Sequence, residues 1–416
     1  MTYCMMKKYF GALFFIGLFS ACNNNDEPQP VPEKENITIL SYLVANNNLN
    51  DYLVGNIATM YDGLLSMNKP ATFLVYWDGK TPIGTNNASH LILKYQTDGK
   101  GNINGRPVHD LPGTMEEVLN EGVIVKEYAP QLSTDKDVMT AVLKDMMANA
   151  NSDKFGLIFG SHGSSWLSSI FTSRSFGQDG QGTDNTMLIS DMAEALKSVG
   201  KKFEFILFDV CYMGTAEVAY TFRDVANYQI SSAMEVPAYG FPYDLTFEDL
   251  YEGTVENYKA VCETYLDYYK LLYEIDNYAW GTISLIDSKE MVNLTNQLKS
   301  EIVVHKEMLA DYDSSHLEEY GKSSGPYIAV DLGHFVKDLN GGSMPTTFSS
   351  QLEKTVLYKG CLEKARPYNY AVDAANYSGL GVYIPVKERP KWNTYFKTID
   401  WYTAAGWNEV TFSWGF

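Results

Sequence analysis

Cysteine is scarce in this sequence, and its spacing excludes two classes of structure. Five cysteines occur in 416 residues, and no two of them form a Cys-x-x-Cys pair. A disulfide framework or a cysteine-based zinc site is therefore not expected. The histidines at 90, 109, 305, 316 and 334 show no ligand spacing, and no EF-hand loop is present, so we predict no metal site.

Basic residues are also few, with 32 Lys and Arg against 51 Asp and Glu and a formal net charge of -19. An acidic surface repels phosphate backbones and anionic headgroups, so nucleic acid is not expected as a partner. The sequence also offers no apolar run long enough for a membrane-spanning helix. The apolar run at 10–19 is too short to span a bilayer comfortably. Apolar residues still make up 45% of the chain, enough for a large core.

The first residues have the order of a bacterial export signal. Two lysines precede the apolar run, which ends in small residues directly before Cys22. The stretch Phe19-Ser20-Ala21-Cys22 resembles a lipobox, which implies cleavage before Cys22 and lipidation of its sulfur. A plain signal peptide with an incidental cysteine is the alternative.

A polar, Pro-rich stretch at 23–36 reads as a flexible tether. Its acidic pair, Asp26-Glu27, resembles the surface-export signals of Bacteroidetes lipoproteins. We expect a protein anchored by lipid to the bacterial outer membrane, at the cell surface or the periplasmic face. The expected organisation is a signal peptide at 1–21, a tether at 22–36 and one folded domain at 37–416, with a core at about 37–245 and a C-terminal extension at about 246–416.

The folded part alternates between strand-like and helix-like segments. Buried, β-branched runs predict strands at 37–45, 71–77, 155–159 and 203–208. Apolar stripes predict helices behind a capping box at Thr134 and Asp137, and around 192–199; longer helices are predicted at 250–273 and 288–310. This alternation indicates an α/β fold with a mainly parallel sheet and helices on both faces. The functional site of such a sheet lies beyond the C-terminal ends of its strands.

Two predicted strands end in residues that form a nucleophilic pair. The strand at 155–159 leads into His162, and the strand at 203–208 leads into Cys211. A predicted helix at 215–222 begins soon after Cys211, and its N-terminus and an imidazole would both favour the reactive thiolate. His162 would supply the proton that a leaving amine needs. Taken singly, each residue is more often structural, but their positions and a separation of about 50 residues favour catalysis.

Gly163 follows the histidine and leaves room for a substrate backbone. Its N–H and that of Cys211 could hold the oxyanion of a tetrahedral intermediate, each such donor contributing about 3 kcal/mol to transition-state stabilisation.

The sequence resembles the clostripain family of cysteine peptidases, relatives of caspases, gingipains and legumain. The resemblance rests on His-Gly and Asp-x-Cys after the two strands, and it spans about 37–410. Further matching segments lie at 42–49 (YLVANNNL), 231–243 (SSAMEVPAYGFPY), 327–335 (YIAVDLGHF) and 378–385 (SGLGVYIP). The first of them has asparagines where acidic residues are commoner. The resemblance implies a caspase-like αβα sandwich and endopeptidase activity.

Asp209 precedes the nucleophile by two residues, so in a continuing strand both side chains point the same way. A carboxylate there would select Arg or Lys before the scissile bond, as the resemblance also implies. The alternative is that Asp209 accepts backbone hydrogen bonds and only shapes the turn. Ser232 and Glu235 are further candidates for lining the substrate cleft.

Self-processing is a further expectation from the resemblance. The stretch 163–188 is rich in Gly, Ser and Thr and holds a single basic residue, Arg174. Cleavage after Arg174 would open the cleft. No cofactor is required by this chemistry, and calcium dependence, which is mixed in the family, stays open. The expected partners are peptides or proteins with basic residues.

Three other functions fit the sequence less well than a cysteine peptidase does. A non-catalytic surface lipoprotein on a peptidase scaffold would not need both His162 and Cys211. An α/β-hydrolase would need a Gly-x-Ser-x-Gly turn, which the sequence lacks. A caspase-like enzyme with acidic specificity would need arginines in its pocket, and Asp209 argues against it.

Overall fold

The computed structural model describes residues 35–83, 88–108, 112, 114–167, 176–180, 185–321 and 328–415. Cys22 and Arg174 lie outside these residues. Residues Lys34–Phe416 make up one compact unit. Within the described part, no helix is both long and apolar enough to cross a membrane.

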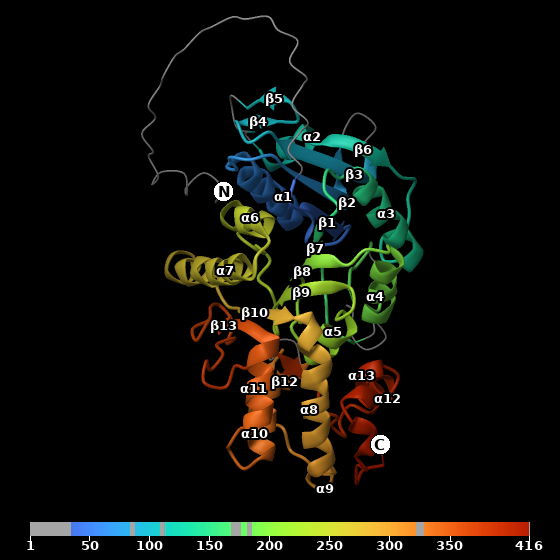
Figure 1. Ribbon diagram of the computed structural model, residues 1–416, viewed down its shortest axis with the longest axis vertical. Coiled ribbons are helices and arrows are strands. Elements are labelled where there is room, and N and C mark those ends of the chain that lie inside the picture. Colours follow the sequence, from blue (N-terminus) through green and yellow to red (C-terminus); the bar gives the residue numbers. More distant parts are fainter. Residues whose placement is uncertain are drawn as a thin grey trace, which may run out of the picture. The chain divides into compact units, whose positions relative to one another are not determined.

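The first half of the chain alternates strands and helices as its hydrophobic pattern predicts (Figure 1). Its elements are β1 (Thr38–Ala45), α1 (Asn50–Leu65), β2 (Ala71–Ile83), β3 (Ala88–Thr97), β4 (Asn102–Ile103), β5 (Arg106–Pro107), α2 (Met115–Glu121), β6 (Val123–Glu127), α3 (Lys136–Ala148), β7 (Phe155–Gly160), α4 (Ile189–Ser198), β8 (Phe203–Asp209), α5 (Ala216–Thr221) and β9 (Ala226–Ser231).

The second half is richer in helices. Its elements are α6 (Tyr243–Glu252), α7 (Val255–Ile275), β10 (Thr282–Asp287), the 3-10 helix η2 (Ser288–Glu290), α8 (Met291–Val304), α9 (Lys306–Leu309), β11 (Glu319–Tyr320), β12 (Ala329–Asp331), α10 (Leu332–Leu339), α11 (Thr346–Thr355), β13 (Val356–Cys361), β14 (Gly381–Val382), α12 (Pro390–Phe396), α13 (Asp400–Ala404) and the 3-10 helix η3 (Trp407–Glu409).

The main sheet is parallel at its centre and antiparallel at its margins. Its order is β13-β10-β9-β8-β7-β1-β2-β3-β4-β5, with β6 paired to β3. The four pairs from β9 to β2 are parallel, and β10, β13 and β3 run antiparallel to their neighbours. Every residue of β1 and β7 is buried, because helices cover both faces. The predicted α/β fold with a mainly parallel central sheet is confirmed.

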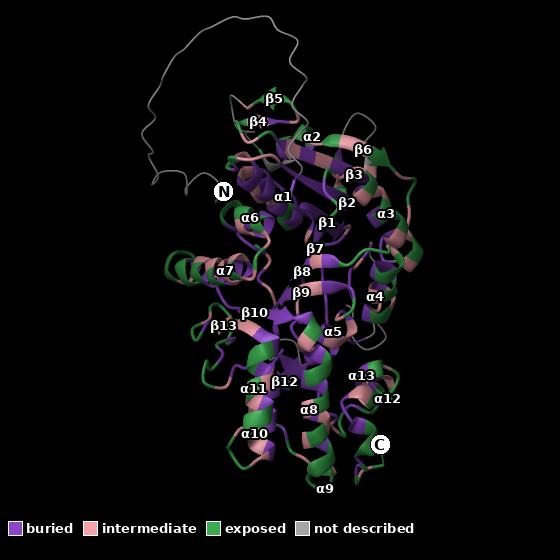
Figure 2. Ribbon diagram, in the orientation of Figure 1, coloured by how far each residue is buried: buried purple, intermediate pink, exposed green. Residues whose placement is uncertain are grey.

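Helices cover the two faces in separate groups. Helix α6 contacts both α1 and α7 on one face, and α4 contacts both α3 and α5 on the other face (Figure 1). A second, three-stranded sheet, β11-β12-β14, and the helices after α7 extend the molecule at one end. One continuous apolar core nevertheless runs from Leu40 in β1 to Phe412 near the C-terminus (Figure 2).

Two predicted helix boundaries are wrong for identifiable reasons. Asp135, not Thr134, caps α3, because its carboxylate accepts the backbone N–H groups of Asp137 and Val138. The single helix predicted at 250–273 is divided between α6 and α7. Gly253 ends α6 in the left-handed conformation with φ 71°, and Thr254 caps α7.

Candidate active site

The sheet places His162 and Cys211 at the same edge. Strands β7 and β8 are parallel neighbours, and Gly160 is paired with Asp209 at their C-terminal ends. His162 and Cys211 each follow that last pair by two residues. Neighbouring strands lie about 4.8 Å apart, so the two loops leave the sheet side by side. Both residues line one cleft with a volume of about 1060 Å³, together with Gly163 and Asp209.

Asn48 contacts the imidazole and was not predicted as a site residue. His162 is buried, and its Nε2 lies 2.6 Å from Oδ1 of Asn48. Asn48 comes from the loop after β1, the strand beside β7. An amide oxygen can only accept, so Nε2 carries the hydrogen in this contact. The resemblance drew attention to this segment, but sequence alone could not assign the contact.

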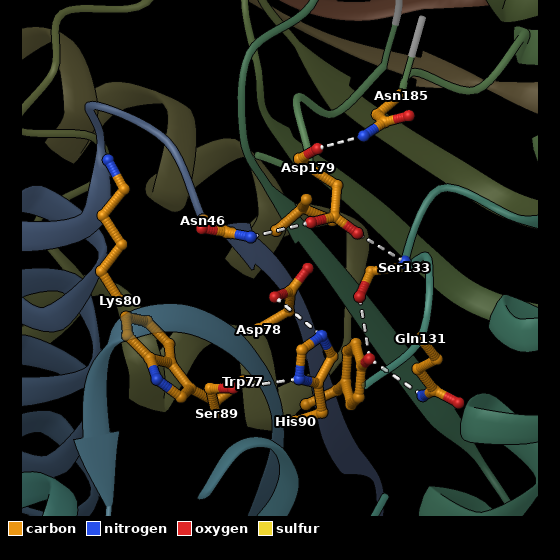
Figure 3. A network of polar contacts seen from close by, with 12 residues as sticks. Asn46, Trp77, Asp78, Lys80, Ser89, His90, Gln131, Ser133, Asp179 and Asn185 are labelled. Carbon is orange, nitrogen blue, oxygen red and sulfur yellow. Dashed lines mark hydrogen bonds and ion pairs between the residues drawn. The ribbon is translucent and has the colours of Figure 1, made fainter. Parts of the chain in front are cut away.

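The neighbouring asparagines hold the chain around the histidine. Asn46 Nδ2 donates to Asp179 Oδ1 at 3.1 Å, and Asn47 Nδ2 donates to the carbonyl of Gln178 at 2.9 Å. The backbone N–H of Gly177 donates to the His162 carbonyl at 2.9 Å. Figure 3 shows Asn46 and Asp179 facing each other. The asparagine-rich segment therefore joins the 176–180 segment to His162.

The backbone after the cysteine is tightly constrained. Tyr212 has a φ of 63°, a conformation that costs about 1 kcal/mol or more for a bulky residue. Its N–H donates to the Met234 carbonyl at 3.0 Å, and Cys211 Sγ lies 3.8 Å from the Val236 carbonyl oxygen. These contacts fix the direction in which the Cys211 side chain leaves the strand.

The helix predicted after Cys211 is shorter than expected. Helix α5 has six residues and begins five residues after the cysteine. A short helix has a small dipole whose effect falls off within its first turn, so α5 contributes little to favouring the thiolate.

Gly163 serves the packing of the two loops. A Cβ at this position would lie 2.2 Å from Val210 Cγ1 and 3.0 Å from the Cys211 carbonyl oxygen. The prediction attributed the glycine to the approach of a substrate, whereas the structure shows that the loop after β8 occupies that space. Gly163 still lines the cleft.

Asp209 lines the cleft, and hydrogen bonds from three neighbouring residues hold its carboxyl in place. Its Oδ2 accepts hydrogen bonds from Asn56 Nδ2 at 3.1 Å, Tyr243 Oη at 3.0 Å and the N–H of Phe241 at 3.3 Å. Burial raises the pKa of Asp209 to about 6, although the bonds from Tyr243 and Phe241 lower it. The carboxyl therefore accepts a backbone hydrogen bond, as the structural alternative expected, and also lines the cleft.

The structure separates the two candidates from the segment after β9. Glu235 lines the cleft and accepts a hydrogen bond from Tyr370 Oη at 3.3 Å. Ser232 does not reach the cleft, because its side chain is fully buried against Thr282, 2.9 Å away. The prediction for Ser232 is therefore wrong: its hydroxyl ties the end of β9 to β10.

The two other thiols of the described part are packed. Cys262 is fully buried in α7, and burial raises its pKa far above the usual range. Burial also raises the pKa of Cys361 to about 12. The residues described by the structure contain no group of three or more His, Cys, Asp or Glu side chains that could hold a metal ion.

The segments that carried the resemblance converge on this edge. The segment at 42–49 supplies Asn48, and the segment at 231–243 supplies Glu235 and two of the donors to Asp209. From the segment at 327–335, Ile328 lines the cleft. The segment at 378–385 packs behind the loop after Cys211, where Gly381 bridges Thr215 and the N–H of Tyr383 donates to Glu217 at 2.7 Å.

Comparisons with known proteins agree with this architecture. The model of the clostripain family matches residues 41–414. Clostripain from Hathewaya histolytica is 25% identical over 249 residues, covering 56% of this chain and 46% of the relative's own length.

Solved structures of C11 proteases are similar over most of the chain. A zymogen from Parabacteroides distasonis is 27% identical, with a TM-score of 0.69, and the match covers 90% of this chain and 99% of that one. A secreted C11 cysteine protease from Bacteroides thetaiotaomicron, bound to an irreversible peptide inhibitor, is 23% identical, with a TM-score of 0.68 and the same coverage. By sequence and by fold, the chain belongs to the clostripain family of cysteine peptidases.

Proposed function

We propose that the protein is an endopeptidase whose catalytic pair is His162 and Cys211. The observation that carries this proposal is the parallel pairing of β7 and β8, which releases both residues from adjoining strand ends into one cleft. The nucleophile is the one thiol of the described residues that lines this cleft.

The reaction begins with the Cys211 thiolate, which attacks the carbonyl carbon of the scissile peptide bond. Since Nε2 of His162 faces Asn48, Nδ1 is the nitrogen that takes the thiol proton and passes it to the leaving amine. The N–H groups of Gly163 and Cys211 hold the oxyanion. Water then attacks the acyl-enzyme, with His162 as the base, and releases the new carboxyl end.

Asp209 supports selection of Arg or Lys before the scissile bond. Its carboxyl lies in the floor of the same cleft, two residues before the nucleophile, and its orientation is fixed by three donors on one oxygen. An Arg or Lys side chain that reaches this carboxyl forms a charge-assisted hydrogen bond, whereas a carboxylate side chain is repelled. Glu235 adds a second acid to the cleft.

A peptide-library digest tests the proposal. Cys211→Ala and His162→Ala should each lower kcat/KM by at least about a thousandfold, since nucleophile and base act as a unit. Asp209→Ala should keep the activity but lose the preference for basic residues. Cys361→Ala, a thiol outside the cleft, is the matched control and should cleave as the wild type does. Full activity of the Cys211→Ala protein would refute the assignment.

We also propose self-processing after Arg174, in the segment between the histidine and the cysteine. Purified protein should split at this position, and both Cys211→Ala and Arg174→Ala should stay whole. Splitting of the Cys211→Ala protein without added protease would rule out self-cleavage.

Export and lipid anchoring at Cys22 belong to the same proposal, supported by the lipobox-like sequence. The full chain should label with radioactive palmitate and enter the detergent phase, whereas Cys22→Ser should do neither. Wild-type protein that takes up no palmitate would show that the N-terminal segment is a plain signal peptide.

The proposed chemistry uses side chains and water, so no cofactor is required. Treatment with a chelator should leave kcat/KM unchanged. A loss that calcium restores would instead establish calcium dependence.

A further inference from the structure

One wall of the cleft is formed by aromatic rings in mutual contact. We call these six residues, which the last sentence of this paragraph names, the aromatic wall. Successive ring centroids lie 6.0, 5.1 and 4.7 Å apart along the first four residues, and 5.2–5.4 Å apart among the last three. Five of the six line the cleft, and Tyr239 links two of them. The residues are Tyr52, Tyr239, Tyr278, Trp280, Tyr368 and Tyr370.

The rings come from four parts of the chain. Tyr52 lies in α1, Tyr239 follows β9, the pair at 278 and 280 precedes β10, and the pair at 368 and 370 follows β13. Three of them stay open to solvent: Tyr52 is 41% exposed, Tyr239 36% and Tyr368 49%. Single exposed aromatics are ordinary, but a connected set in a cleft marks a surface that binds an apolar group.

Another part of the cleft lining carries charged side chains. The residues at 388–391 put Glu388, Arg389 and Lys391 on the cleft, and the Arg389 guanidinium lies 4.3 Å from the centre of the Trp392 ring. Pro390 and Trp392 of the same segment also line the cleft, so its charges alternate with apolar groups, whereas the aromatic wall carries no charged side chain. An apolar side chain of a bound peptide is therefore favoured on the aromatic wall.

Strand order decides which part of a substrate meets this wall. Strand β10 is antiparallel to β9, and β13 is antiparallel to β10, so the start of β10 and the end of β13 lie at the same edge as Cys211. Trp280 and Tyr370 thus lie on the β9–β10 side of Cys211, and His162 lies on the β7 side. The leaving amine must face His162, so the residues before the scissile bond extend toward the part of the aromatic wall that contains Trp280 and Tyr370.

We propose that the aromatic wall is a subsite for a large apolar or aromatic side chain upstream of the cleaved residue. This inference rests on the proposed function, and it narrows the substrates to peptides that combine such a side chain with a following Arg or Lys. Ring-on-ring contact and burial together should favour an aromatic over alanine by about tenfold or more in kcat/KM.

The test uses tetrapeptide reporter substrates that end in Arg, with Phe, Ala or Asp placed in turn at each of the three upstream positions. At one of these positions Phe should exceed Ala by about tenfold or more. Tyr368→Ala should reduce that ratio at least threefold. Tyr368→Phe, which keeps the ring, should retain the ratio and is the matched control.

Binding to the Cys211→Ala protein supplies a second readout that does not need turnover. Peptides with upstream Phe should bind more tightly than those with Ala, and Tyr368→Ala in the same background should remove the difference. Cleavage after Arg with equal rates for Phe and Ala at all three positions would overturn the subsite and leave the peptidase assignment intact. Absence of all cleavage, with binding still selective for Phe, would instead refute the proposed function and leave the aromatic wall as an apolar binding surface only.

Discussion

At the scale of single residues, Asn48 is the main addition to the predicted pair. It touches the imidazole at Nε2, and in the proposed reaction it acts through His162, as a positioning residue. An imidazole that has lost its partner can rotate or change tautomer, and both changes spoil proton transfer.

We expect Asn48→Ala to lower kcat by about ten- to a hundredfold with little change in KM, because ring orientation and not substrate contact is lost. Asn48→Asp keeps an acceptor and should recover much of the rate, with an altered pH profile because a carboxylate stabilises the imidazolium. Stopped-flow and steady-state assays would measure this. Equal kcat in all three proteins would contradict the positioning role.

Asp209 gives a second prediction, on pH. Burial raises its pKa to about 6, so the carboxyl of the free enzyme becomes neutral as the pH falls through that value. A neutral carboxyl does not attract a cation, and the preference for a basic residue should therefore weaken below about pH 6 and be full above about pH 7.

The ratio of kcat/KM for an Arg substrate to that for its neutral citrulline analogue isolates this effect, because titration of the catalytic pair cancels. The ratio should fall with decreasing pH in the wild type. In Asp209→Asn it should be low and independent of pH. A wild-type ratio that stays flat from pH 5 to pH 8 would show that Asp209 does not bind the substrate cation.

At the scale of elements, the loop after β9 approaches Asp209 because of Gly240. This glycine has a φ of 70°, and a Cβ there would lie 2.4 Å from Asp209 Oδ2. Its carbonyl accepts a hydrogen bond from Tyr269 Oη at 2.7 Å, which joins the loop to α7. The loop, the helix and the carboxyl are thus held as one unit.

Gly240→Ala should displace the Asp209 carboxyl and reduce the Arg-to-citrulline ratio by about tenfold, because a shift of about 1 Å disrupts a charged hydrogen bond. Gly200→Ala is the matched control, since Gly200 has a φ of 80° and a Cβ there meets nothing within 4 Å. Both variants bear the cost of a left-handed alanine, and Gly240→Ala also bears the clash, so its melting temperature should fall further than that of Gly200→Ala. A normal ratio in Gly240→Ala would contradict the close approach.

At the scale of the whole molecule, an acidic network lies within the sheet at β2 and β3. Asp78 is fully buried, and its Oδ1 lies 3.4 Å from Nε2 of His90 on the paired strand (Figure 3). Burial first, and then the nearby Asp179 carboxylate, together raise the pKa of Asp78 to about 7. Asp179 also accepts the N–H of Ser133 at 2.8 Å and the Nδ2 of Asn46 at 3.1 Å, so it joins the 176–180 segment to the loops that follow β6 and β1.

This pair should make the protein less stable as the pH rises. The folded pKa of Asp78 lies above its unfolded value, so folded protein keeps a proton that unfolded protein loses between about pH 4 and pH 7. Asp78→Asn should remove that slope and raise the free energy of unfolding by a few kcal/mol at pH 8, with little change at pH 4, as one pKa unit corresponds to about 1.4 kcal/mol.

Denaturant unfolding at the two pH values measures the effect. Asp267→Asn, which changes an exposed carboxylate, should leave the pH dependence unchanged. Destabilisation of Asp78→Asn by the same amount at both values would mean that the charge of Asp78 is fully compensated in the folded state.

The sequence by itself determined four neighbouring strands of the main sheet, β1, β2, β7 and β8, and the positions of His162 and Cys211 after two of them. Buried β-branched runs have few other conformations that satisfy their backbone groups, and parallel strands expose their C-terminal ends at one edge. Both His162 and Cys211 were therefore predictable from local pattern. Arg174 and Cys22 were assigned from sequence and lie outside the described residues.

What only the tertiary structure decided are the contacts between residues far apart in the chain. The hydroxyl of Ser232 turned inward to Thr282, Asn48 met His162, and rings from four segments gathered into the aromatic wall. Local patterning records whether a side chain is apolar, but the partner of a polar or aromatic group depends on which loops the sheet order brings together. For this reason the meeting of His162 and Cys211 at one edge could be predicted from strand ends, and their surroundings could not.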